Sequence, residues 1–292
     1  ALLSNTTGSN NTAVGYQAAY TSATGTRITA VGYLAMKGGT GADGSYSTGI
    51  GAYALNAITT AQFNTAVGDN ALGNTTTGGY NTAMGQGSLQ LNTTGVNNTA
   101  VGYQAAYSNS IGTNNTAIGY TALYANTTGG NNTAVGRQAL NANTIGVSNV
   151  AVGNDALLSN TTGNYNVAVG QQALNSNTIG ISNTAVGYQA GQSNTTGSVT
   201  AIGSGALTSK TTGAENTAVG QSALAANTTG VRNTAVGLQA LLTATGATDN
   251  TAIGRNAMAL TTTGGYNTVV GVSSMQNNTV GAYNVAVGNQ AL

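Results

Sequence analysis

The sequence predicts an all-β protein, a parallel β-solenoid of 17 coils with a 17-residue repeat. Three observations support this fold class: one motif returns at a fixed spacing, its residues alternate as they do in a β-strand, and a turn sequence rich in Asn, Thr and Gly follows most copies. The motif is Ala-Val-Gly, in which Ile or Met sometimes replaces Val. Its glycines, called the motif glycines below, are Gly15, Gly32, Gly51, Gly68, Gly85, Gly102, Gly119, Gly136, Gly153, Gly170, Gly187, Gly203, Gly220, Gly237, Gly254, Gly271 and Gly288.

The uniform period offers no place to divide the chain, so we expect residues 1–292 to form one continuous array. The step from Gly32 to Gly51 is longer than the regular step by two residues, and the step from Gly187 to Gly203 is shorter by one. We expect a two-residue bulge at the first of these steps and a tightened turn at the second. The first two residues, Ala-Leu, occupy the same repeat position as the last two, and we expect the chain to be a fragment of a longer fibre protein.

The three residues before each motif glycine predict a short β-strand. Thr or Val comes first in nearly every copy, Ala second and Val, Ile or Met third, which is a period of two. One strand face therefore carries Thr or Val together with Val, and the other carries Ala together with Gly. Because both faces are constant from copy to copy, we expect both to be packed, with Val152 for example in the interior. A slim coil covers one face only, so we expect a parallel homotrimer with the Ala and Gly face or the Leu corner between chains.

A second apolar pair occupies the third and fourth positions after each motif glycine. It is Ala or Ser followed in most copies by Leu, as in Ala173-Leu174, and it predicts a second short strand or its corner. The N-T-T-G segment between the pairs predicts a turn, because Asn can bond its own backbone and Gly accepts a positive φ. A helical fold is disfavoured, because each of the 44 Gly residues opposes a helix by roughly 1 kcal/mol relative to Ala.

Composition narrows the classes of function. Charged residues make up 4% of the chain and the net charge is +1, which favours neither a nucleic-acid nor an anionic-membrane partner. No run of apolar residues is long enough for a membrane span. The chain has no His and no Cys, and its five carboxylates are spread over different coils. We therefore expect no enzyme activity, no metal site and no cofactor.

Tyrosine is the abundant aromatic residue, with 14 copies. Most tyrosines fall in repeat columns that also hold charged residues such as Arg137 and Asp249, so these columns are expected to face solvent. Exposed tyrosines could stack on sugar rings, or they could cover strand edges and stack along the fibre. The candidate glycan or receptor contacts directly after a motif glycine are Tyr16, Tyr33, Tyr103, Tyr120 and Tyr188. The candidate contacts that lie five residues before a motif glycine are Tyr80, Tyr165, Tyr266 and Tyr283.

The N-T-A-V-G-x-x-A-L segment resembles the N-S-V-A-I-G-x-x-A repeat in the heads of trimeric autotransporter adhesins of the YadA type. The fuller N-T-A-V-G-Y-Q-A-L…N-T-T-G form is similar to repeats of phage tail fibres and related surface proteins that end in an endosialidase-type chaperone. The resemblance covers the entire chain, although the adhesin repeat is shorter. It implies a homotrimeric rod of left-handed β-rolls on a cell surface or a virion.

The expected function is that of an extracellular structural or adhesive fibre segment, a trimeric shaft or head that extends or presents a binding surface for cell attachment. A phage tail-fibre shaft for host recognition is the alternative. The expected partners are further copies of the chain and a host-surface glycan or protein receptor. Ice binding by rows of Thr is a minor alternative, and the expected burial of the Thr before Ala-Val-Gly counts against it.

Overall fold

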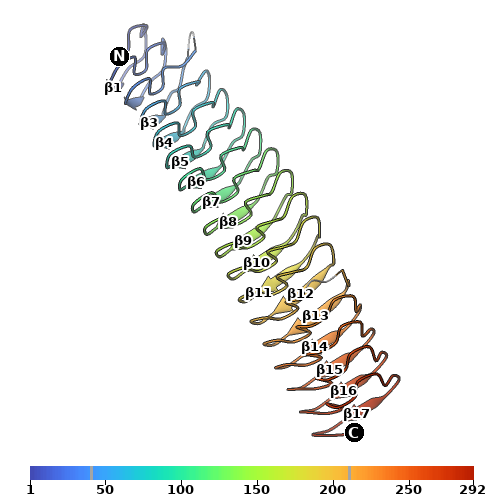
Figure 1. Ribbon diagram of the computed structural model, residues 1–292. Helices are drawn as coiled ribbons and strands as arrows, with labels where there is room; N and C mark the ends of the chain where they lie inside the picture. Colours follow the sequence, from blue (N-terminus) through green and yellow to red (C-terminus); the bar gives the residue numbers. More distant parts are fainter. Residues whose placement is uncertain (40–41, 210–211) are drawn as a thin grey trace. The chain divides into compact units, whose positions relative to one another are not determined.

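The structure is a computed structural model that describes residues 1–39, 42–209 and 212–292. It confirms an all-β parallel β-solenoid with a repeat of about 17 residues, and the described residues contain no helix. The chain divides into two compact units, residues 1–148 and 149–292. Within each unit, one short strand per coil stacks on the strand of the next coil (Figure 1).

The first unit holds eight strands, and successive strands within the unit pair in parallel. The pairing is in register, so that Thr lies beside Thr and Ala beside Ala or Gly. The strands are β1 (Thr12–Val14), β2 (Thr29–Val31), β3 (Thr48–Ile50), β4 (Thr65–Val67), β5 (Thr82–Met84), β6 (Thr99–Val101), β7 (Thr116–Ile118) and β8 (Thr133–Val135).

The second unit repeats this arrangement with nine strands. They are β9 (Val150–Val152), β10 (Val167–Val169), β11 (Thr184–Val186), β12 (Val199–Ile202), β13 (Asn216–Val219), β14 (Thr234–Val236), β15 (Thr251–Ile253), β16 (Thr268–Val270) and β17 (Val285–Val287).

Both irregular spacings lie in the connections between strands. Thr29 still pairs with Thr48, and the added residues fall in a segment that includes residues 40 and 41, which lie outside the described residues. Thr184 still pairs with Thr200, although one residue is missing between Gly197 and β12. The strand register is kept in both places, so the connections absorb the change in length.

The interior of each coil is built from small side chains. The Ala at the centre of nearly every strand is buried, and the Ala-Leu pair at the opposite corner is buried in most coils, as Ala100, Ala122 and Leu123 illustrate. Because Ala takes little room, the Leu from the facing corner fills the space between the two walls. The core is therefore a continuous column of Ala and Leu in each unit.

The prediction that the Ala and Gly face or the Leu corner lies between chains is wrong, because both are buried inside the coil of one chain, and the predicted interior position of Val152 is wrong as well. The Ala column is already closed off from solvent inside one coil, whereas Val152 is half-buried and Ile118 is 40% exposed. We call the outward side of the strands, made of the residues three and one before each motif glycine, the Thr–Val face. The physical reason is space, because a narrow coil accommodates Ala inward and leaves the branched side chains outside.

The Ala-Leu pair forms a corner and not a second strand. In the described residues this pair lies in turns, where the backbone alternates into the left-handed region, as at Gln138 (φ 55°) and Leu140 (φ 53°). Left-handed residues reverse the direction of the chain within a few positions. One strand and two turn regions therefore close each coil.

Two columns of buried asparagines join successive coils. In the first column, the Asn81 side chain accepts the Asn98 backbone N–H at 2.9 Å and donates to the Gly95 carbonyl at 2.9 Å. The second column is the Asn of N-T-T-G. Its Asn109 donates to the Gly112 carbonyl in its own turn at 3.0 Å and to the Asn92 Oδ1 one coil earlier at 3.1 Å. The predicted turn chemistry of Asn is confirmed, and its burial adds hydrogen bonds between coils.

Candidate functional site

The nine candidate tyrosines lie on the surface, in two columns that follow the repeat. Tyr16, Tyr33, Tyr103, Tyr120 and Tyr188 are exposed directly after a motif glycine, and Tyr80, Tyr165, Tyr266 and Tyr283 are exposed five residues before one. The prediction that these columns face solvent is confirmed. In the second column the backbone adopts a left-handed conformation, for example a φ of 60° at Tyr80 and 58° at Tyr165. This conformation turns the side chain outward just before the buried Asn of the next position.

Stacking brings several of the candidates together in pairs. The ring centroids of Tyr16 and Tyr33 are 5.4 Å apart, and those of Tyr103 and Tyr120 are 5.3 Å apart, with interplanar angles of 11° and 12°. The pairing follows from the fold, because equivalent residues of stacked coils lie one strand spacing apart.

Other candidates stand apart from these pairs. Tyr266 stacks on Tyr283 at 5.0 Å in the second unit. Tyr188 shares its column with Gln171 and Ser204 in the neighbouring coils, and the next residue of the Tyr165 column is Ser182. The structure therefore does not gather the nine candidates into one site.

A three-ring stack in the first unit extends the set of candidates. Tyr46 stacks on Phe63 at 4.8 Å, and Phe63 stacks on Tyr80 at 4.9 Å. The Arg27 guanidinium lies 5.4 Å from the Tyr46 ring centroid and continues the column by a cation–π contact. Of these, only Tyr80 is among the nine candidates. Phe63 lies five residues before a motif glycine, as Tyr80 does. Aligning the repeats by position would therefore have identified Phe63 from the sequence.

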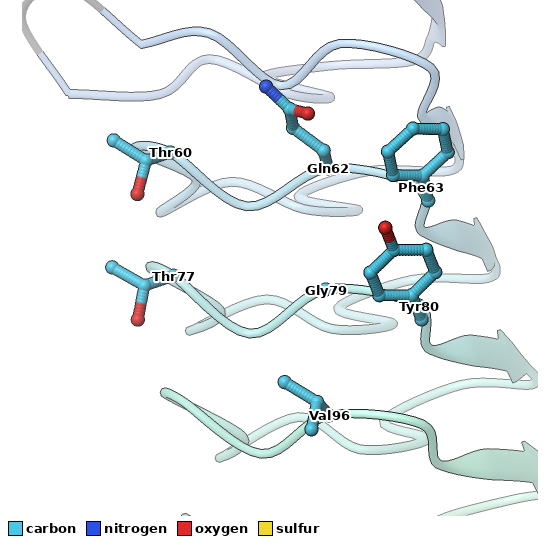
Figure 2. Close-up of a pocket in the computed structure, with 7 residues that line it drawn as sticks. All are labelled: Thr60, Gln62, Phe63, Thr77, Gly79, Tyr80 and Val96. Atoms are coloured by element: carbon cyan, nitrogen blue, oxygen red, sulfur yellow. The ribbon is translucent and has the colours of Figure 1, made fainter.

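A shallow hollow of about 250 Å³ lies beside this stack. Its lining comes from three successive coils: Thr60, Gln62, Phe63, Thr77, Gly79, Tyr80 and Val96. Figure 2 shows the two threonines on one side and the two rings on the other, with Gly79 between them. The hollow thus combines an aromatic wall with a hydroxyl wall.

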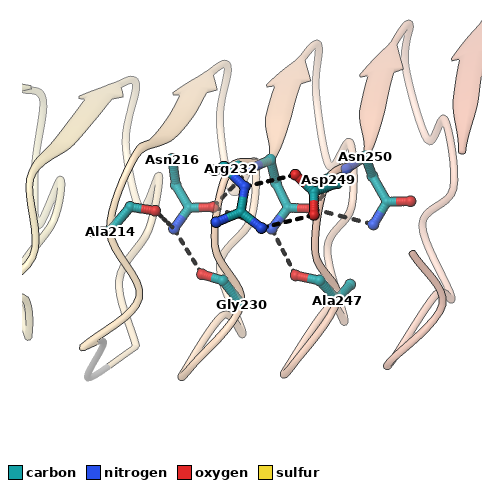
Figure 3. A network of polar contacts seen from close by, with 8 residues as sticks. Ala214, Asn216, Gly230, Arg232, Ala247, Asp249 and Asn250 are labelled. Atoms are coloured by element: carbon teal, nitrogen blue, oxygen red, sulfur yellow. Dashed lines mark hydrogen bonds and ion pairs between the residues drawn. The ribbon is translucent and has the colours of Figure 1, made fainter. Parts of the chain in front are cut away.

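In the second unit, the column of residues five positions before each motif glycine carries a pair of opposite charges. The Arg232 Nε and Nη2 atoms donate to the two carboxylate oxygens of Asp249 at 2.7 and 2.9 Å (Figure 3). The hydrogen bond and the positive charge of Arg232 lower the pKa of Asp249 below its ordinary value. In turn, the hydrogen bond and charge of Asp249 raise the pKa of Arg232. Because both side chains are accessible to water, the pair stabilises the fold only weakly.

The carboxylates of the described residues form no group of three or more that is close enough to hold a metal ion. Over the same part of the chain, no helix is long and apolar enough to cross a membrane.

The chain matches no known protein-family model, and no curated protein matches its sequence. The repeat, the surface columns and the hollow are therefore the observations on which a function can rest.

Proposed function

We propose that this chain is a segment of an extracellular structural fibre, a homotrimeric β-solenoid that extends or presents a binding surface for cell attachment. The observation that supports the proposal best is the exposed Thr–Val face. Each strand of the first unit places Thr and one of Val, Ile or Met on this face, in register with the strands beside it. Met84 and Ile118 on it are 45% and 40% exposed.

A regular apolar stripe of this kind is typical of a surface that another chain covers. The other walls of the coil carry mainly Asn, Gln, Thr and Tyr, and their exposed apolar residues, such as Ile111 and Ile145, do not recur in every coil. Further copies of the same chain are the simplest partners, because two identical stripes can repeat one contact from coil to coil when the chains run in parallel. The resemblance to trimeric adhesin heads supports three copies and a location outside the cell.

Sedimentation analysis of matched variants tests the assembly. Ile118 lies on the Thr–Val face, whereas Ile145 is 52% exposed on the N-T-T-G turn of the same unit. We expect Ile118→Asp to convert a trimer to a monomer that keeps its β circular-dichroism spectrum, and Ile145→Asp to remain trimeric. A wild-type chain that sediments as a monomer at all concentrations, or two variants that behave alike, would contradict the proposal.

The tyrosine columns are the proposed sites of adhesion along the fibre. Replacing Tyr103, Tyr120 and Tyr188 with Ser should weaken binding to a glycan array and leave the assembly intact. If the wild-type chain binds no glycan or receptor, we propose that it serves as a spacer that holds a binding domain away from the surface.

A phage tail-fibre shaft is the alternative assignment, and the resemblance supports it equally. The flanking sequence of the full-length gene product separates the two. A membrane-anchor barrel would indicate a cell surface, and a chaperone or tail-attachment domain would indicate a phage.

Ice binding is a second candidate function, because the expected burial of the strand Thr is wrong. All eight strands of the first unit carry Thr on the outward side, one strand spacing apart. Thermal hysteresis of the purified chain tests this candidate. Absence of hysteresis at millimolar protein would exclude it, and its loss in Thr99→Asp with retained folding would support it.

A further inference from the structure

We infer that the hollow over Gly79 binds a neutral pyranose sugar. The inference deepens the adhesive part of the proposed function and rests on it, because it names the ligand class and the coils that take it. The site differs from the tyrosine pairs in having a floor and two walls of different chemistry.

The floor is open because Gly79 interrupts a column of larger residues. Gln62 precedes it in this column and Val96 follows it, and both line the two ends of the hollow. A Cβ atom at Gly79 would lie 2.9 Å from the Gln62 carbonyl oxygen, so a side chain here would press on the backbone of the preceding coil. Without a side chain at Gly79, the surface between the Gln62 and Val96 side chains stays hollow.

The aromatic wall is formed by Phe63 and Tyr80. Their rings are 4.9 Å apart and nearly parallel, at 7°, and Tyr46 holds Phe63 from the other side. Phe63 is 42% exposed and Tyr80 is 62% exposed, so both rings offer apolar surface to the hollow. Figure 2 shows the two rings side by side along the same edge. The C–H groups of a pyranose ring can pack against such a surface, since aromatic side chains combine a large apolar body with a fixed geometry.

The opposite wall supplies hydrogen-bonding groups that the fold does not use. The hydroxyls of Thr59 and Thr76 donate to carbonyls of the next coil, Thr76 O and Thr93 O, at 2.8 and 3.1 Å. Their neighbours Thr60 and Thr77 line the hollow instead, and their hydroxyls have no hydrogen-bond partner among the described residues. Two hydroxyls one coil apart can therefore bond the hydroxyls of a sugar.

The Gln62 side chain limits one end of the hollow. Its Nε2 donates to Asp43 Oδ2, and this bond holds the amide towards the preceding coil, away from Gly79 (Figure 2).

The charge of the lining selects the ligand class. None of the seven lining residues is ionisable near neutral pH, and the nearby Arg27 lies over Tyr46. An acidic sugar would lose its hydration here without gaining a cation. The small volume admits a single ring and not a folded protein segment, so a neutral pyranose fits the chemistry best.

Saturation-transfer NMR on the intact chain tests the site. The probes are the methyl pyranosides of glucose, galactose, mannose and N-acetylglucosamine, with sialic acid as the anionic comparison. At least one neutral pyranoside should receive saturation from the aromatic protons, and sialic acid should not.

Two matched pairs of variants locate the binding. Gly79→Val fills the hollow with the residue that the next coil carries at this position, and Gly130→Val is its control, because a Cβ there lies 3.0 Å from the Thr113 carbonyl oxygen. Tyr80→Ser removes the aromatic wall. Its control is Tyr124→Ser, because Tyr124 also stacks on a ring one coil away, Tyr107, but lies outside the two candidate columns. We expect affinity to fall about tenfold in Gly79→Val and Tyr80→Ser, a difference of about 1.4 kcal/mol, and to stay unchanged in the controls.

Three outcomes would overturn the inference: no saturation of any neutral pyranoside, equal losses within a matched pair, or stronger binding of sialic acid. Sedimentation of the same samples keeps the two proposals distinct. A trimer without sugar binding refutes the sugar site alone, and a sugar-binding monomer refutes the trimer alone.

Discussion

The side-chain oxygen of Asn81 accepts the backbone N–H of Asn98 at 2.9 Å, so an amide side chain of one coil holds the backbone of the next. The Asn98 side chain repeats this contact with the Asn115 N–H at 2.9 Å and donates to the Gly112 carbonyl at 2.9 Å. These asparagines are fully buried. They therefore satisfy backbone groups that a three-residue strand leaves outside its ladder.

Replacement of one ladder residue should be costly. Asn98→Val introduces the residue that Val199 provides in the same column, yet it leaves the Asn115 N–H buried without a partner. The Gly112 carbonyl loses one of its two donors and keeps Asn109. We expect a loss of about 1–3 kcal/mol in the free energy of unfolding. Urea denaturation measures it, with the exposed Asn74→Ala as a control expected within about 0.5 kcal/mol of wild type. Equal midpoints would argue against a buried ladder.

The corner leucines should carry much of the core stability. Leu123 is fully buried, and Leu123→Ala should destabilise the fold by about 2–5 kcal/mol because the narrow core collapses only partly onto the cavity. Ile145→Ala, at an exposed turn position of the same unit, should be nearly silent. Thermal melts of the two variants compare them directly. A larger effect at Ile145 would reverse the assignment of inside and outside.

The motif glycines should resist any side chain. Gly102 has a φ of 133°, and a Cβ atom there would lie 2.5 Å from the Gly119 carbonyl oxygen of the next coil. We expect Gly102→Ala to cost at least about 3 kcal/mol through backbone strain and overlap. Gly246 is the control, because its nearest atom would be 3.5 Å away and its φ is not positive. Chemical denaturation should place Gly246→Ala within about 1 kcal/mol of wild type. A tolerated Gly102→Ala would contradict the close approach of coils.

The ion pair of Arg232 and Asp249 should be visible in a titration. Arg232 lowers the pKa of Asp249, so the Arg232→Gln variant should raise that pKa back toward its ordinary value of 3.8. A lowered folded-state pKa contributes stability above the unfolded pKa and loses it as the pH falls through the folded pKa. The unfolding free energies of wild type and variant should therefore differ slightly at neutral pH and converge in acid. Carboxyl NMR shifts measure the pKa, and an unchanged value in the variant would refute the pairing.

Much of the fold could be predicted from the repeat. Its regular period places one strand per coil, and the alternation before Gly102 or Gly119 predicts the position of that strand. Charged residues such as Arg232 in the tyrosine columns correctly predict that those columns face water. The hollow was harder to predict from the sequence, because Phe63, Gly79 and Thr60 belong to different repeat columns. The residues that line it come together only when three coils are stacked.

The class of fold, the strand positions and the solvent-facing columns follow from the amino-acid sequence, since each depends on local periodicity or on the cost of burying charge. Which strand face lies inside the coil depends on how the coil closes in three dimensions. Val101 is more apolar than Ala100, so hydrophobicity alone favours Val in the core, and both columns are equally regular. The interior of the closed coil has room opposite Leu123 only for the small methyl group of an Ala such as Ala100. Val101 is therefore turned outward. The sequence of a single repeat does not show this limit of space, because it arises only when the coil closes.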